Sequence, residues 1–232
     1  MEQTCKVLAW YTKITLVLLF AMLGLVVGAQ FFSWEDSTGD TTEKTSESTA
    51  KNPALAARLA PPKVLTAFEL TAHDQKPLNI ERLKGKWTLL FFGYTHCPDI
   101  CPTTLTELAQ TAQQLEPSIL KDTQFIFVSV DPRRDSPESL AKYVGYFNEH
   151  FLGATGSIEA LAVLVRQLDS KFSLGTDPAG EPIVNHSSAM LLIDPQVRYY
   201  ARLKAPHYAE EISAQYLALR SDYQRERTQA EK

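Results

Sequence analysis

Apolar and polar residues divide the 232-residue chain into unlike stretches. Residues 14–34 are apolar and carry no charge, a length sufficient for a helix across roughly 30 Å of hydrocarbon. Residues 35–61 are mostly small, polar or charged, so they cannot bury enough surface to offset the entropy lost on ordering. From residue 62 to 225, apolar runs alternate with segments of helical spacing. The pattern predicts a transmembrane anchor, a flexible linker and one globular domain, followed by a charged tail at 226–232.

The spacing of apolar residues distinguishes the expected strands of the globular domain from its expected helices. Continuous apolar runs predict buried strands, whereas apolar residues three or four positions apart predict helices. The expected strands are residues 87–92, 124–130, 189–194 and 197–203, with a hairpin over 68–80 that covers one edge. The expected helices are residues 103–115, 136–147, 157–168 and 208–225, and residues 176–185 are expected to form a loop. Strand, helix and strand in succession imply a right-handed parallel crossover, so the pattern predicts an α/β fold with a central mixed sheet flanked by helices.

A pair of cysteines lies in the turn between the strand at 87–92 and the following helix. Pro102 suits the first helical position, which places Cys101 at the N-cap and Cys97 one short turn earlier. Free N–H groups of residues 103–105 would then point toward the sulfurs, and the positive helix end would favour thiolate over thiol. Such a pair can be an inert disulfide, a redox pair or a soft-metal site, and its C-x-x-x-C spacing does not choose among these.

Composition and charge narrow the function classes. The net charge is -4, and no run of Lys and Arg is interleaved with aromatic residues, so nucleic acid is not an expected partner. Of the three cysteines, Cys5 precedes the apolar segment, which leaves one pair in the folded part. One pair does not make a disulfide scaffold, and a reactive or metal-binding pair is expected instead.

Charges around residues 14–34 predict the orientation of this segment. Lys6 and Lys13 precede it and Glu35 and Asp36 follow it, so the positive-inside rule leaves residues 1–13 in the cytoplasm and exports the domain. In a bacterium the protein would be a single-pass inner-membrane protein with a periplasmic domain. A cleavable signal peptide is the alternative, because residues 27–29 could serve as a cleavage site.

Three motifs resemble those of a known family. Residues 93–102 read Gly-Tyr-Thr-His-Cys-Pro-Asp-Ile-Cys-Pro, residues 128–132 read Val-Ser-Val-Asp-Pro, and residues 185–188 read Asn-His-Ser-Ser. Together they resemble the Sco/SenC family of membrane-tethered copper-binding proteins, in the same order along the chain. The resemblance implies a thioredoxin-like fold, a copper ion as cofactor, and the copper-accepting subunit of cytochrome c oxidase or another copper chaperone as partner. For a eukaryotic protein it also implies a domain in the mitochondrial intermembrane space.

The resemblance also singles out His186 as a third metal ligand beside Cys97 and Cys101. Two thiolates and one imidazole suit Cu(I), which prefers soft ligands and low coordination numbers. Without the resemblance, His186 would be read as a histidine that hydrogen-bonds loop backbone. Many relatives carry an aspartate where this chain has Asn185, which removes one possible partner of the site.

Other candidates are weaker. His96 neighbours Cys97 but its side chain is expected to point away, and Met190 lies in an apolar strand that favours packing. Asp131 and Asp194 precede Pro at strand ends, where a turn role is expected; Asp131 also lies in a family-like block and is kept as a supporting residue. The remaining histidines are expected to be solvated: His73, His150 and His207.

Two functions remain open. In the first, the protein is a copper metallochaperone that delivers copper to the copper centre of cytochrome c oxidase. In the second, it is a membrane-tethered thiol-disulfide oxidoreductase in which Cys97 attacks and Cys101 resolves, keeping a copper acceptor's cysteines reduced; His186 is not needed for this activity. A thioredoxin-fold peroxidase is a weaker third reading, because the attacking cysteine of those enzymes lies in a different motif.

Overall fold

The computed structural model describes residues 58–176, 178, 180 and 182–231. The expected anchor at 14–34 and most of the expected linker lie outside these residues. Within the described part, no helix combines the length and the apolar character needed to cross a bilayer.

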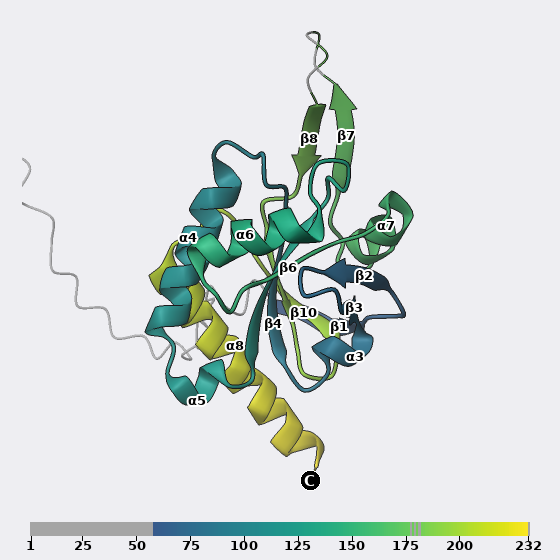
Figure 1. Cartoon of the computed structure of the whole chain (residues 1–232). Helices are drawn as coiled ribbons and strands as arrows, with labels where there is room; N and C mark the ends of the chain where they lie inside the picture. The colour runs from purple at the N-terminus through teal and green to yellow at the C-terminus, as the bar shows by residue number, and fades with distance from the viewer. Residues whose placement is uncertain (1–57, 177, 179, 181, 232) are drawn as a thin grey trace, which may run out of the picture. The chain divides into compact units, whose positions relative to one another are not determined.

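An eight-stranded mixed sheet forms the centre of the described domain (Figure 1). Its strands follow the order β1-β10-β9-β4-β5-β6-β2-β3, and β4, β5 and β6 run parallel while the remaining neighbours pair antiparallel. The bounds are β1 Arg58–Val64, β2 Glu69–Ala72, β3 Pro77–Asn79, β4 Trp87–Gly93, β5 Thr123–Ser129, β6 Leu152–Thr155, β9 Met190–Ile193 and β10 Arg198–Leu203. A separate antiparallel hairpin of β7 (Phe172–Thr176) and β8 (Pro182–His186) extends from the sheet.

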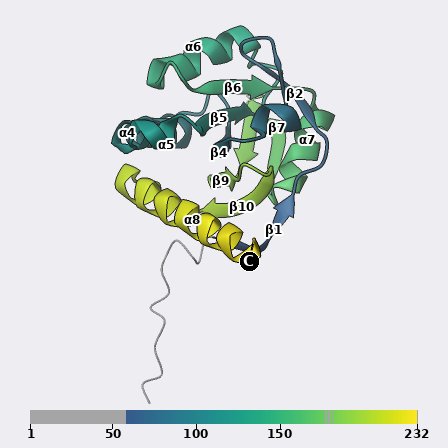
Figure 2. The same ribbon diagram turned by 90° about the horizontal axis from the view of Figure 1, so that it is seen from below.

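Helices cover both faces of the sheet. Figures 1 and 2 show α4 (Ile100–Gln114), α6 (Pro137–Phe147) and α8 (Ala209–Ala230) on one side and α7 (Ile158–Gln167) on the other. Two short helices, α3 (Ile80–Leu83) and α5 (Pro117–Leu120), lie in connections. The fold class predicted from the sequence is therefore confirmed for the described domain.

Strand β4 divides the hydrophobic core into two parts because its side chains alternate between the two faces of the sheet. Leu89 and Phe91 pack with α4 and α8, whereas Leu90 and Phe92 pack with α7. All of β4 is buried, which agrees with its uninterrupted apolar sequence. The buried strand fixes the position of the cysteine turn that follows it.

Most expected elements are confirmed, including the hairpin at the sheet edge and the two helices capped by serine. Ser136 accepts a hydrogen bond from the Ser139 N–H and Ser157 accepts one from the Ala160 N–H, and Pro137 occupies the first turn of α6. Ile158, the first residue of α7, is 37% exposed, whereas Leu161 and Leu164 of the same helix are fully buried.

Three expectations about element bounds are wrong. Strand β1 begins at Arg58, inside the expected linker, because this segment pairs with β10 and its Leu59 packs on the core. Strands β7 and β8 form a hairpin with five paired positions, from Phe172↔His186 to Thr176↔Pro182, so Thr176 and residues 182–185 of the expected loop lie in strands. Helix α8 continues to Ala230, into the expected charged tail.

Candidate metal centre

Cys97 lies in the turn between β4 and α4, as the sequence predicted, but the helix starts earlier than expected and includes Cys101. Helix α4 begins at Ile100 and its N-cap is Asp99, so Cys101 is the second helical residue and Pro102 the third. The Thr103 N–H already donates to the Asp99 carbonyl at 3.3 Å, so it does not point toward the sulfurs. Pro102 is tolerated because the first-turn N–H groups of a helix have no intrahelical acceptor.

Close packing against the end of β4 positions Cys101. The Cys101 side chain is fully buried, whereas Cys97 is half-buried, and both are free thiols in the structure. A Cβ atom placed on Gly93 would lie 2.7 Å from Cys101 Sγ and 2.5 Å from a ring carbon of Phe127. Glycine is therefore required at position 93 by the close approach of the sulfur and the Phe127 ring.

His186 comes from the end of β8 and faces the sulfurs. Its Nε2 lies 3.5 Å from Cys101 Sγ, and its Nδ1 lies 3.0 Å from the carbonyl oxygen of Ser187. Because a carbonyl only accepts, Nδ1 carries the proton and Nε2 presents a lone pair to the thiol. The rings of Phe91 and Tyr94 contact the imidazole edge to face, with centroids 5.9 and 5.8 Å away.

Ligand atoms of Cys97, Cys101 and His186 all lie within 4.8 Å of one another. Atoms bound to one ion at the roughly 2.0–2.3 Å typical of zinc–nitrogen and zinc–sulfur bonds lie up to about twice that distance apart. Small side-chain rotations would therefore bring the three atoms around a single soft ion. The structure thus brings together the three residues that the sequence singled out.

Burial dominates the electrostatics of this group. Desolvation raises the pKa of the Cys101 thiol far above its ordinary value, although a backbone hydrogen bond at Tyr94 acts in the opposite direction. Desolvation also lowers the pKa of His186 from 6.5, despite hydrogen bonds with backbone groups of Ser187 and Phe92 that favour its charged form. The expectation that the helix end makes Cys101 a thiolate is therefore wrong. Burial favours the protonated Cys101 thiol over the thiolate and the neutral His186 imidazole over the imidazolium.

A buried carboxyl group that the sequence analysis missed holds the cysteine turn. Asp135 is 1% exposed, and it accepts hydrogen bonds from the Thr95 N–H, the Thr95 hydroxyl and the Ser129 hydroxyl. His96 is also near it, with Nδ1 3.6 Å from Oδ1. Asp135 follows β5 closely, as does Asp131, which the sequence favoured as a supporting residue. The Asp131 carboxyl group pairs with Arg133 and Arg134 instead.

Two histidines expected to be solvated have structural roles. His207 is 8% exposed and its Nε2 donates to the Ser188 carbonyl at 2.7 Å, which anchors the segment after His186. His73 Nδ1 accepts a hydrogen bond from the Gly153 N–H at 3.1 Å. His150, by contrast, is exposed as expected.

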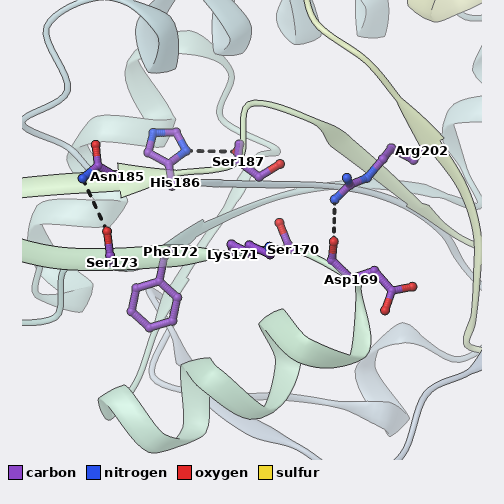
Figure 3. Close-up of a pocket in the computed structure, with 9 residues that line it drawn as sticks. All are labelled: Asp169, Ser170, Lys171, Phe172, Ser173, Asn185, His186, Ser187 and Arg202. Carbon is purple, nitrogen blue, oxygen red and sulfur yellow. Dashed lines mark hydrogen bonds between the residues drawn. The ribbon is translucent and has the colours of Figure 1, made fainter.

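The remaining candidates lie away from the sulfurs or pack in the core. The Asn185 amide donates to the Ser173 hydroxyl across the β7–β8 hairpin at 3.4 Å, so it points away from the imidazole (Figure 3). Met190 is fully buried in the core that also contains Phe91. The buried carboxyl group of Asp194 pairs with Arg198 at the β9–β10 turn.

The fold and the cysteine turn define a thioredoxin-like domain, and comparison with solved structures agrees. The crystal structure of Arabidopsis thaliana ScoI with copper bound aligns over 69% of this chain and 99% of that chain, with a TM-score of 0.64 and 30% sequence identity. The sequence profile described as SCO1/SenC matches residues 56–219. The chain belongs to the SCO1/SenC family.

Relatives of known name support this assignment. A Stutzerimonas stutzeri protein named for copper binding is 36% identical over 144 residues, which cover 62% of this chain and 71% of that protein. The bovine mitochondrial SCO2 homolog is 40% identical over 151 residues, which cover 63% of this chain and 56% of that protein. The chain thus matches little more than half of the bovine relative.

Proposed function

We propose that this protein is a copper metallochaperone whose cargo is held by Cys97, Cys101 and His186. The observation that carries the proposal is the approach of the three ligand atoms to within 4.8 Å of one another. Two sulfurs and an imidazole nitrogen match the ligand preference of copper, and the Nδ1 hydrogen bond to Ser187 orients the ring as metal sites require. The Arabidopsis relative, titled as a copper-bound structure, supports the same choice of metal.

The acceptor is proposed from the family resemblance to be the copper centre of cytochrome c oxidase, reached directly or through another copper chaperone. Transfer would proceed by ligand exchange, with thiolates of the acceptor displacing Cys97, Cys101 and His186 one at a time. Half-buried Cys97 is the more accessible of the two thiols and is expected to exchange first.

The proposed arrangement in the cell is a domain tethered to the inner membrane. Residues 14–34 would form the single anchor, residues 35–61 would supply most of the linker, and the domain would face the periplasm or the mitochondrial intermembrane space. The mitochondrial name of the bovine relative is compatible with the second location. A tether raises the effective concentration of the donor near a membrane-bound acceptor.

Metal content after copper loading and desalting tests the proposed site. The reduced chain should retain about one copper ion, because three soft or borderline ligands converge on one position. Cys97→Ser and His186→Ala should each lose most of it, and His150→Ala, which changes an exposed histidine, should not. Normal retention in Cys97→Ser and His186→Ala would refute the proposed ligand set.

A thiol-disulfide oxidoreductase is the second candidate, and the unequal burial of the two cysteines favours it. The Cys97 thiolate would attack a partner disulfide and release one partner thiolate; Cys101 would then attack the Cys97 sulfur, forming the Cys97–Cys101 disulfide and releasing the second thiolate. Two electrons pass to the partner. His186 Nε2, 3.5 Å from Cys101 Sγ, is placed to accept the Cys101 proton, so the histidine need not be dispensable as the sequence analysis assumed.

Trapping distinguishes this second candidate. A Cys101→Ser variant cannot resolve the mixed disulfide, so it should accumulate a covalent complex with a disulfide-containing acceptor peptide on a non-reducing gel. A Cys97→Ser variant is the matched control and should form none. Absence of any covalent complex with Cys101→Ser would rule out the thiol-disulfide oxidoreductase function.

A further inference from the structure

Tyr94 is one of the aromatic residues that contact the His186 imidazole. Its ring centroid lies 5.8 Å from that of the imidazole, at an interplanar angle of 83°. Phe91, which also contacts the imidazole, is a fully buried residue of β4, so the sheet sets its position. Tyr94 lies one residue beyond β4 and is only half-buried. Fewer core contacts fix its ring, and its other neighbours therefore decide where the ring lies.

Arg134 is such a neighbour of Tyr94. The central carbon of its guanidinium lies 5.6 Å from the centroid of the Tyr94 ring, within the range of a cation–π interaction. Burial and the neighbouring Cys97 and Cys101 raise the pKa of the Tyr94 hydroxyl, whereas Arg134 lowers it. The Tyr94 ring thus contacts the guanidinium and the imidazole, and its hydroxyl lies near the two cysteines.

A buried carboxyl group holds the Arg134 guanidinium. Asp131 is fully buried, and its Oδ2 accepts a hydrogen bond from Arg134 Nε. The backbone of this loop is fixed as well, because the Arg134 N–H donates to the Asp131 carbonyl at 3.2 Å and the Asp131 N–H donates to the Ser129 hydroxyl at 3.1 Å. Charge-assisted hydrogen bonds are strong enough to restrict an arginine side chain to one orientation. The loop after β5 is therefore connected to His186 through Arg134 and Tyr94.

We propose that Arg134 is a positioning residue, which holds Tyr94 against His186 and so keeps the imidazole in the orientation that a metal ligand needs. This role rests on the copper site proposed above and extends it to the loop after β5. The hydrogen bond from His186 Nδ1 to the Ser187 carbonyl fixes one direction in the ring but leaves its tilt free. Edge-to-face contacts with Phe91 and Tyr94 restrict that tilt.

A purely structural role of Arg134 is the alternative. Its ion pair with Asp131 closes the turn between β5 and α6, and loss of this pair could lower the stability of the domain without any change at the imidazole. The two roles differ in the state of the His186 ring in the folded protein. The test must therefore report on that ring.

Ring resonances of His186 in the metal-free full chain test the proposal without copper. Proton–carbon and long-range proton–nitrogen spectra at fixed pH report the shifts caused by neighbouring aromatic rings and the nitrogen that carries the proton. In Arg134→Met the His186 signals should move toward those of the exposed His150, which serves as an internal reference. Arg133→Met is the matched control, because Arg133 pairs with the same Asp131 at 3.6 Å, and it should leave the His186 signals unchanged.

Copper affinity, measured by competition with a Cu(I) chelator, shows whether Arg134 acts through Tyr94. Arg134→Met and Tyr94→Leu should each weaken binding about tenfold, as loss of a partner that orients a metal ligand does. Tyr94→Phe keeps the ring and should bind copper as wild type does. The variant that combines Arg134→Met with Tyr94→Leu should be no weaker than Tyr94→Leu alone, because the arginine then has no ring to hold.

A second variant covers the case in which Arg134→Met does not fold because the Asp131 carboxylate is left unpaired. Asp131→Asn combined with Arg134→Met contains no such charge and should fold, with the same change in the His186 signals. Wild-type His186 signals in a folded variant without Arg134, or additive losses of copper affinity, would overturn the proposal. A chain that binds no copper but shows the change at His186 would refute the proposed copper site alone and support the positioning by Arg134.

Discussion

Gly93 decides whether the cysteine turn can close against the sheet. It is the last residue of β4, and Cys101 Sγ and the Phe127 ring occupy the space that a side chain would need. Both neighbours belong to the buried core, so neither can move aside at low cost. The glycine of the family-like motif thus has a packing reason in this chain.

Gly93→Ala should lower the free energy of unfolding by about 1–3 kcal/mol, the usual cost of overpacking a core. Gly145→Ala is the matched control, because Gly145 lies in the last turn of α6 and nothing lies within 4 Å of its added Cβ. It should stabilise the domain by about 0.5–1 kcal/mol through helix propensity. Urea unfolding measures both, and equal effects of the two substitutions would contradict this account of Gly93.

His186 links the candidate site to pH through its burial. The folded domain lowers the pKa of this imidazole below 6.5, so the unfolded chain binds more protons just below that pH. The contribution of His186 to stability is thus present above pH 6.5 and is lost as the pH falls toward the folded-state pKa. Acid should also weaken copper binding, since a protonated imidazole cannot ligate.

The unfolding midpoint of the metal-free chain, followed by circular dichroism from pH 7.5 to 5, checks the sign of this linkage. Wild type should lose stability over this range, and His186→Ala should lose less. His150→Ala should behave as wild type does, because its side chain is exposed. A steeper loss in His186→Ala than in wild type would show that the linkage has been assigned the wrong sign.

At the scale of elements, the β4–α4 turn is held from outside by the start of the next crossover. Asp135, which precedes α6, reaches across to Thr95 and to Ser129 at the end of β5. The Asp135 carboxyl group therefore connects the loop after β4 with the end of β5 through hydrogen bonds. These hydrogen bonds hold the cysteine turn in position.

Asp135→Asn should lower the free energy of unfolding by about 1–3 kcal/mol, because the amide presents a donor where the carboxyl group accepted three hydrogen bonds. Asp99→Asn is the control, since Asp99 is exposed and its side chain makes no cap hydrogen bond. Denaturant unfolding at pH 7 distinguishes them. A neutral effect of Asp135→Asn would mean that the turn is held by packing alone.

Sequence periodicity predicted the elements of the sheet well and the β7–β8 hairpin badly. Buried strands such as β4 have a strong local signal, because every residue of β4 is apolar or buried. Residues 176–185 contain Pro178, Gly180 and Pro182, which are loop signals, and only the backbone pairing from Phe172 to His186 reveals a ribbon. Most residues of β7 and β8 are exposed or half-buried, so the pattern of apolar residues does not reveal that these two strands pair.

At the scale of the whole domain, the candidate site is made by topology. Strand β9 pairs with β4, so the segment that precedes β9 lies over the turn that follows β4 and carries His186 to the cysteines. The sequence identified His186 only through the family resemblance. The residues around His186 do not by themselves indicate that its ring packs against Cys101. Asp135 and His207, which support the site through tertiary hydrogen bonds, were missed for the same reason.

Copper K-edge X-ray absorption of the loaded chain tests the central claim most directly, with wild type compared with His186→Ala. The account predicts two sulfur neighbours and one imidazole nitrogen neighbour in wild type. The smaller amount of copper that His186→Ala still holds should lack the imidazole contribution and keep the sulfurs. Identical spectra from the two proteins, or a wild-type spectrum without sulfur neighbours, would contradict it.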